Sequence, residues 1–127
     1  MKVNVDTQFK GDHILARYRG PDSPEISGAI LKVVLNACEE HQCFKILALG
    51  YLENSLSTLD NYDMAAVYAG AGFSSKYRMA WVDMNPETRE SSEFGETVLF
   101  NRGFQVRLFD NEEHGRQWLL DHPTDVT

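Results

Sequence analysis

The sequence predicts an α/β fold of the order β-β-α-β-α-β-α-β-α, with a mixed, mostly parallel sheet, one antiparallel edge strand and flanking helices. Two observations predict it. After an opening hairpin, short apolar runs alternate with longer segments whose apolar residues recur at helical spacing. Each expected helix also begins with residues that favour a helix start. Such alternation indicates right-handed crossovers between parallel strands, and the 127 residues fit a single domain, 1–127.

The expected strands are short and mostly apolar. Val3 and Val5 alternate with polar neighbours, which is typical of a strand with one buried face. The run at 44–49 is apolar and bounded by Gly50, which indicates a central strand. The remaining strands are expected at 13–18, 77–82 and 104–109.

The expected helices have recognisable ends. Residues 23–25 (Ser-Pro-Glu) combine an N-cap hydroxyl, a first-turn proline and an early carboxylate, and residues 85–87 (Asn-Pro-Glu) repeat this signal. Between them, a second helix is expected from about 58 to 72. The third helix runs towards Gly103, where glycine can adopt the left-handed conformation that ends a helix. Asp110 and Glu113 predict a capping box for the last helix, which carries Trp118, Leu119 and Leu120.

Composition excludes several classes of protein. A net charge of −7 without a cluster of Lys and Arg argues against a nucleic-acid partner. No segment approaches the ~20 apolar residues that span a bilayer, and the N-terminal MKVNVDTQFK lacks the apolar stretch of a secretory signal. Two cysteines do not make a disulfide framework. We therefore expect a cytoplasmic protein without a membrane span.

Two polar segments contain residue types that occur in metal or catalytic sites. Cys38 and Cys43 lack the Cys-x2-Cys spacing and further ligands of structural zinc, and on a helix they point in different directions, so Cys38 is interpreted as a core residue. Glutamates recur every three residues near a helix start, which indicates a solvated face rather than a catalytic pair (Glu87, Glu90, Glu93 and Glu96). We expect no metal, no cofactor and no enzymatic activity.

The C-terminal third carries a family resemblance. Val98-Leu99-Phe100-Asn-Arg-Gly103-Phe104-Gln-Val106-Arg-Leu-Phe109-Asp110-Asn-Glu-Glu113 is similar to a helix, glycine, strand, phenylalanine and acidic cap of a known family, and Gln117-Trp118-Leu119 matches its closing helix. With the order of strands and helices, the sequence resembles the STAS domain family over nearly the whole chain. The likeness is greater to its SpoIIAA-like branch, the anti-sigma-factor-antagonist fold.

The resemblance implies a regulatory, non-enzymatic domain. Such domains bind a partner protein through the loop after the third strand and the helix that follows, and in the antagonist branch a Ser or Thr at that helix start is phosphorylated. The equivalent loop here is 50–57, and the equivalent hydroxyls are Ser57 and Thr58. The sequence departs from the family at Gly50, where an acidic residue is common, and it has no Asp-Ser-Ser-Gly motif. Ser57 or Thr58 also suits a plain N-cap, and Ser57 with Asp60 approximates a capping box. Because nearly every helix needs a cap and few caps are switches, the plain cap is the favoured interpretation.

The second helix is unusual because 12 consecutive residues, MAAVYAGAGFSS from 64 to 75, carry no charge. A surface helix normally keeps a polar face. Either this helix packs tightly on the sheet, or its outer side, with Met64, Tyr68 and Phe73, meets a partner, a second copy of the chain or an apolar ligand.

Two hypotheses of function follow. The first is a regulatory domain that binds a partner protein, or a second copy of itself through the second helix. Its binding residues would be Tyr51, Asn54, Ser55, Ser57, Thr58, Met64 and Tyr68. The alternative is a carrier or sensor of a small apolar ligand held beside the second helix by Tyr51, Tyr62 and Trp81. An enclosed cavity of at least ~300 Å³ would favour the carrier.

Overall fold

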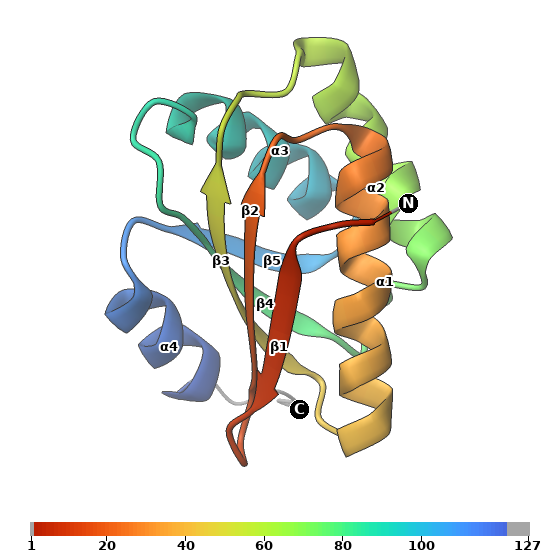
Figure 1. The fold of residues 1–127 in the computed structure, drawn as a ribbon, viewed down its shortest axis with the longest axis vertical. Helices are drawn as coiled ribbons and strands as arrows, with labels where there is room; N and C mark the ends of the chain where they lie inside the picture. The colour runs from red at the N-terminus through yellow and green to blue at the C-terminus, as the bar shows by residue number, and fades with distance from the viewer. Residues whose placement is uncertain (1, 122–127) are drawn as a thin grey trace.

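A computed structural model describes residues 2–121 of the chain and shows a five-stranded sheet with four helices (Figure 1). The elements follow the predicted order: β1 (Val5–Phe9), β2 (Ile14–Gly20), α1 (Pro24–His41), β3 (Lys45–Leu52), α2 (Thr58–Ala71), β4 (Arg78–Asp83), α3 (Arg89–Asn101), β5 (Gln105–Phe109) and α4 (Glu112–Asp121).

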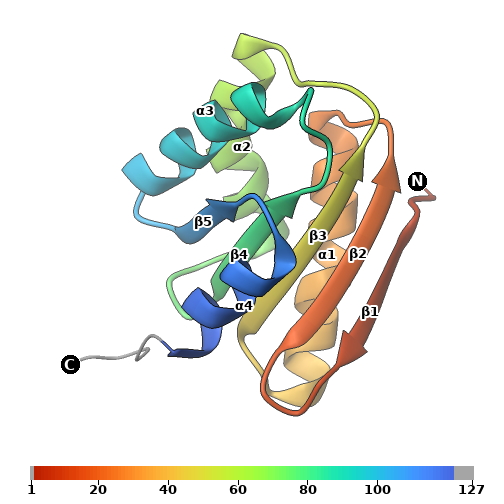
Figure 2. The same ribbon diagram turned by 90° about the vertical axis from the view of Figure 1, so that its left-hand side faces the viewer.

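The sheet has the strand order β1-β2-β3-β4-β5. Strand β1 pairs with β2 antiparallel, and every other pair is parallel, which confirms the predicted mixed sheet with one antiparallel edge strand. Because each right-handed crossover steps in the same direction across the sheet, α1, α2 and α3 cover one face. Among the helices of residues 2–121, only the last, α4, lies on the opposite face (Figures 1 and 2).

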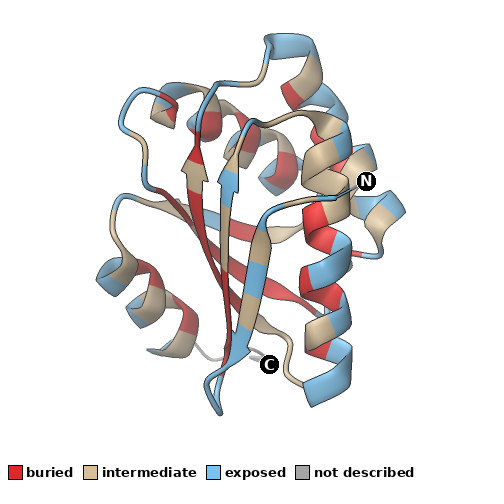
Figure 3. Ribbon diagram, in the orientation of Figure 1, coloured by how far each residue is buried: buried red, intermediate tan, exposed pale blue. Residues whose placement is uncertain are grey.

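Each face of the sheet has its own apolar cluster. Alternate side chains of a strand point to opposite faces, so β3 contributes Ile46 and Ala48 to the three-helix side and Leu47 and Leu49 to the α4 side. The buried residues concentrate along β3, β4 and the inner sides of the helices (Figure 3). The uninterrupted apolar run predicted for β3 is therefore explained by a strand that is covered on both faces.

The predicted helix ends are largely confirmed. The Ser23 side chain accepts a hydrogen bond from the Ile26 N–H, and the Ser57 hydroxyl accepts one from the Asp60 N–H, both at 3.1 Å. Gly103 adopts the left-handed conformation with φ +87° at the end of α3. These are short-range interactions, which is why the sequence alone predicts them.

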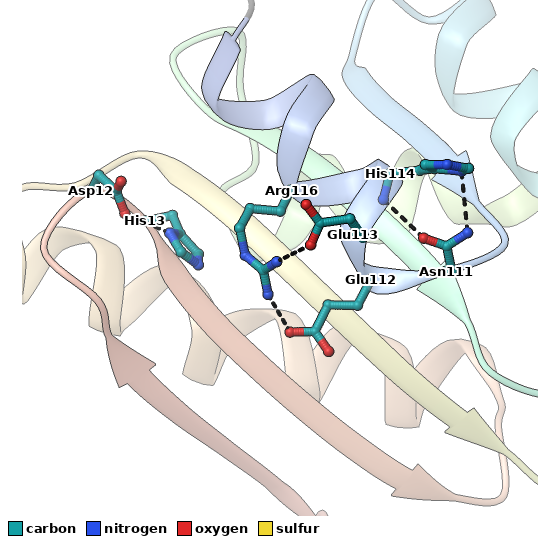
Figure 4. A network of polar contacts seen from close by, with 7 residues as sticks. All are labelled: Asp12, His13, Asn111, Glu112, Glu113, His114 and Arg116. Carbon is teal, nitrogen blue, oxygen red and sulfur yellow. Dashed lines mark hydrogen bonds and ion pairs between the residues drawn. The ribbon is translucent and has the colours of Figure 1, made fainter.

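Two predicted helix starts are wrong. Pro86–Thr88 form a turn, in which the Thr88 N–H bonds to the Asn85 carbonyl, so α3 begins only at Arg89. At α4 the capping side chain is Asn111, whose Oδ1 accepts the His114 N–H at 2.9 Å, instead of Asp110 (Figure 4). The other half of the predicted box, Glu113, forms an ion pair with Arg116, which also contacts Glu112.

Candidate functional site

The loop after β3 is shorter than predicted. The Asn54 side chain fixes its start through hydrogen bonds to the backbone of Asp22. Strand β3 continues to Leu52 because its last residues pair with the end of β2, which leaves 53–57 as the loop. The Asn54 side chain accepts the Asp22 N–H at 2.8 Å and donates to the Asp22 carbonyl at 3.1 Å. This double contact joins the loop to the β2–α1 connection, 32 residues away in the chain.

The far end of the loop is fixed to α3. The Ser91 hydroxyl donates to the Leu56 carbonyl at 3.1 Å and accepts a hydrogen bond from the Asn61 side chain at 2.9 Å. Asn61 itself is buried at the start of α2. The loop is therefore positioned from both ends before any partner binds.

A buried carboxylate organises the neighbouring connection, and sequence reasoning missed it. Asp83, at the end of β4, is fully buried, and its carboxylate accepts hydrogen bonds from the Thr88 and Ser92 hydroxyls at 2.6 and 2.7 Å and from the Asn85 N–H at 3.0 Å. These donors compensate a buried charge that would otherwise be costly. The Asn85 side chain then donates to the Leu52 carbonyl, which links this connection to the end of β3. The available signal was an aspartate that ends an apolar strand five residues before a threonine.

Large apolar side chains are exposed beside this fixed loop. Leu59 is 75% exposed and Tyr62 is 59% exposed, both in the first turns of α2. The Tyr62 ring packs edge-on against Phe94 of α3, with ring centroids 5.1 Å apart. We call the exposed residues of this region the loop–helix surface: Glu53, Asn54, Ser55, Ser57, Thr58, Leu59 and Tyr62.

Of the two alternatives for the second helix, the one in which Met64, Tyr68 and Phe73 face outward is wrong. Met64 and Phe73 are buried in the core, and the Tyr68 hydroxyl donates to the Met79 sulfur at 3.9 Å. Burial raises the pKa of Tyr68 well above its ordinary value. The physical reason is that α2 lies between α1 and α3 and contacts both, so these side chains are covered. After the exposed Leu59 and Tyr62 of its first turns, small residues occupy its exposed side (Ala66, Ala69 and Gly70).

The three aromatic residues predicted to line one ligand pocket do not lie together. Tyr51 packs on the α4 face, where Arg19 lies 5.0 Å from its ring centroid, whereas Trp81 packs on the three-helix face and Tyr62 is exposed. The cavity that Trp81 lines beside α2 holds about 10 Å³, and a second one under Tyr68 holds about 40 Å³. Both are far below the ~300 Å³ typical of ligand pockets.

The departure from the family pattern at Gly50 has a structural cause. A Cβ atom on this glycine would lie 2.6 Å from the Tyr18 hydroxyl oxygen and 2.7 Å from its ring carbon Cζ. The Tyr18 ring thus lies against the backbone of β3, and any side chain at position 50 would collide with it. Burial raises the pKa of Tyr18, so the phenol stays neutral.

The remaining candidate groups have structural surroundings. Cys38 is fully buried, as predicted for a core residue, and burial raises its pKa to about 12. The His13 ring lies 2.7 Å from the Asp12 carboxylate (Figure 4), and this hydrogen bond lowers the pKa of Asp12. Among residues 2–121, we find no group of three or more metal-ligating side chains. None of the helices described here is long and apolar enough to cross a membrane.

Comparison with known proteins supports the fold. No protein-family model matches the sequence, and no curated protein matches it significantly. A solved structure is similar: an uncharacterized protein of the DUF3478 family with a SpoIIAA-like fold from Shewanella loihica PV-4. The two chains share 15% sequence identity over 94% of this chain and 96% of the other, with a TM-score of 0.54. With the strand order described above, this similarity shows that the protein has a SpoIIAA-like α/β fold.

Proposed function

We propose that the protein is a non-enzymatic regulatory domain that binds a partner protein through the loop–helix surface. The observation that carries this proposal is the exposure of Leu59 and Tyr62 beside a loop that is already held by hydrogen bonds. Leu59 and Tyr62 would be the apolar anchors, and Asn54 and Ser55 would form the polar rim.

The fixed loop favours recognition because little conformational entropy remains to be lost on binding. Asn54 and Ser91 hold the two ends of 53–57 in place. Asp60 and Asp63 flank the anchors, so the surface carries negative charge and suits a partner with basic residues around an apolar groove.

Both cysteines are free, which fits our expectation of a cytoplasmic, reducing environment.

Ser57 and Thr58 are the candidate phosphorylation sites of this surface. Both are exposed, and Ser57 is the N-cap of α2. A phosphate there would add nearly two negative charges at the positive end of the helix, next to Leu59 and the two aspartates. A partner that covers Leu59 would have to remove this charged group from water, and this desolvation cost would weaken binding.

The proposal is tested by affinity capture from native cells, followed by titration of the captured protein in purified form. We expect Leu59→Glu and Tyr62→Ser to weaken binding at least tenfold, because each removes an apolar anchor. Val33→Glu is the matched control, since Val33 is 41% exposed on α1, outside the loop–helix surface. Equal binding by wild type and both surface variants would refute the proposal.

A homodimer through the same surface would be a self-association form of this function. Sedimentation of the purified protein over a range of concentrations distinguishes the two cases. If the partner is a second copy, wild type dimerises and Leu59→Glu stays monomeric. If wild type stays monomeric, the partner is a different protein.

A further inference from the structure

A groove of about 510 Å³ runs along the free edge of the sheet, apart from the loop–helix surface. Figure 2 shows β5 at this edge, with α3 on one side and α4 on the other. The groove is lined by apolar and aromatic side chains (Phe100, Phe104, Val106 and Trp118) and by four polar ones, of which Arg107 and Glu96 are charged. The Glu96 carboxylate already accepts the Leu108 N–H. The volume of the groove lies within the range of small-molecule sites.

Behind two of these lining residues lies a buried cation. Arg78 is only 7% exposed, and its guanidinium carbon lies 3.9 Å from the centroid of the Trp118 ring. One terminal nitrogen donates to Gln105 Oε1 at 3.0 Å, whereas its buried Nε has no hydrogen-bond partner in the part of the chain that the structure describes. Within residues 2–121, Arg78 forms no ion pair with a carboxylate.

A buried guanidinium is normally compensated by an ionised carboxylate, and Arg78 has no such partner among the described residues. Stacking on an aromatic ring offsets part of the cost of removing the charge from water, and the amide of Gln105 offsets a further part. An ionised carboxylate would compensate the charge more fully, because its two oxygens match the guanidinium nitrogens. Arg107 adds a second cation at the groove wall.

The backbone N–H groups on the outer edge of β5 are not available to pair with another strand. Its outward N–H groups are already used within the chain: the Leu108 N–H donates to Glu96 Oε2 at 2.7 Å, and the Val106 N–H donates to the Phe104 carbonyl at 3.0 Å. Strand addition needs such groups free. Side-chain recognition of a small molecule is therefore favoured over pairing with a peptide or with a second copy of the chain.

We propose that this groove binds a small apolar carboxylate, with its hydrophobic body against Phe100, Phe104 and Trp118 and its carboxylate directed towards Arg78 and Arg107. Without a ligand, the Gln105 amide oxygen accepts a hydrogen bond from Arg78, and the ligand carboxylate replaces this amide as the acceptor. This site shares no residue with the loop–helix surface, so it is independent of the proposed protein-binding function.

The test uses 2-naphthoate and its neutral analogue 2-naphthamide with the full-length protein. Binding is followed by tryptophan fluorescence and, at the groove itself, by the amide NMR signals of Gly103, Gln105 and Val106. We expect naphthoate to bind at least tenfold more tightly than naphthamide. We also expect Arg78→Met to remove about ten- to hundredfold in affinity for naphthoate, with little change for naphthamide.

Further variants keep the test decisive if Arg78→Met does not fold. Phe100 is 70% exposed, so Phe100→Glu should leave folding intact while repelling naphthoate. Arg19→Gln, an exposed arginine on β2, serves as the control and should bind naphthoate like wild type. Absence of naphthoate binding at millimolar concentration, or equal affinity for the acid and the amide, would overturn the proposal. Signals at the groove that shift with protein concentration alone would assign it to a second copy instead, which also overturns it.

Discussion

Replacement of Gly50 by alanine tests the packing at the carboxyl end of β3. The added methyl carbon would lie 2.6, 2.7 and 2.9 Å from three atoms of the Tyr18 ring system, whereas real Cβ contacts below 3.0 Å essentially do not occur. The Tyr18 side chain is packed against the core of the three-helix face, so it cannot simply swing away. The structure must therefore shift the ring or the backbone of β3.

Overpacking of this kind costs about 1–3 kcal/mol in free energy of unfolding. For a domain of this size that corresponds to a decrease in Tm of about 3–6 °C per kcal/mol. The measurement is urea unfolding of wild type and Gly50→Ala, followed by far-UV circular dichroism, with a check that the m-value is unchanged. Gly70→Ala is the matched control, because a Cβ at this exposed position of α2 meets nothing within 4 Å. There the same substitution should stabilise the protein by up to about 1 kcal/mol.

A double-mutant cycle identifies the clash partner. Tyr18→Ala alone destabilises by about 3–5 kcal/mol, as expected for loss of a buried aromatic ring. If the ring is what Gly50→Ala collides with, the double variant should be more stable than the sum of the single effects by about 1 kcal/mol or more. Gly50→Ala with wild-type stability, or additive effects in the double variant, would refute the reasoning.

Three further predictions concern the capping, the charge and the sheet edge. Ser57→Ala should cost about 1 kcal/mol because it removes the hydroxyl that caps α2, and Thr58→Ala should cost much less. Burial raises the pKa of Asp22 above its ordinary value of 3.8, so its protonated form is favoured in the native state. The stability it contributes at low pH is lost as the pH rises through the native pKa, and Asp22→Asn should remove this loss. Glu96→Leu should release the Leu108 N–H and promote association of β5 edges, measured by light scattering.

Each of these has a simple contrary result. Equal unfolding midpoints for Ser57→Ala and Thr58→Ala would mean that the hydroxyl of Ser57 does not stabilise α2. Parallel stability curves of wild type and Asp22→Asn between pH 3 and pH 7 would contradict the direction of the pKa shift. A Glu96→Leu variant that stays monomeric at high concentration would show that the carboxylate is not what protects the edge.

Short-range signals predicted much of the fold. The serine caps at 23 and 57 and the glycine at 103 depend on backbone conformation within a few residues, so they can be recognised without knowledge of the rest of the chain. The apolar run of β3 likewise indicates a strand covered on both faces. The error at Asp110 arose because the next residue, Asn111, caps the helix instead. At Asn85 the side chain caps only the turn at Glu87, and the helix starts after Thr88, whose hydroxyl donates to the buried Asp83.

The candidate site is formed by contacts between residues far apart in the sequence, which a sequence pattern does not predict. Asn54 binds Asp22 across 32 residues, and Ser91 binds the Leu56 carbonyl across 35. The alternative pocket failed for a related reason: Ala48 is the register partner of Trp81, and Tyr51 lies three residues further along β3, so it points to the opposite face. Alternation along one strand is local, but the register between strands is not.

By itself, the sequence determined the order of strands and helices, three helix ends and the overall acidic charge, because each of these depends on neighbouring residues or on composition. Tertiary structure alone decided that Met64 and Phe73 are buried, that Leu59 and Tyr62 are exposed, and that Arg78 stacks on Trp118. A weakly amphipathic helix has no preferred inner side until its neighbours are in place, and a buried cation acquires its partners only from residues distant in the chain.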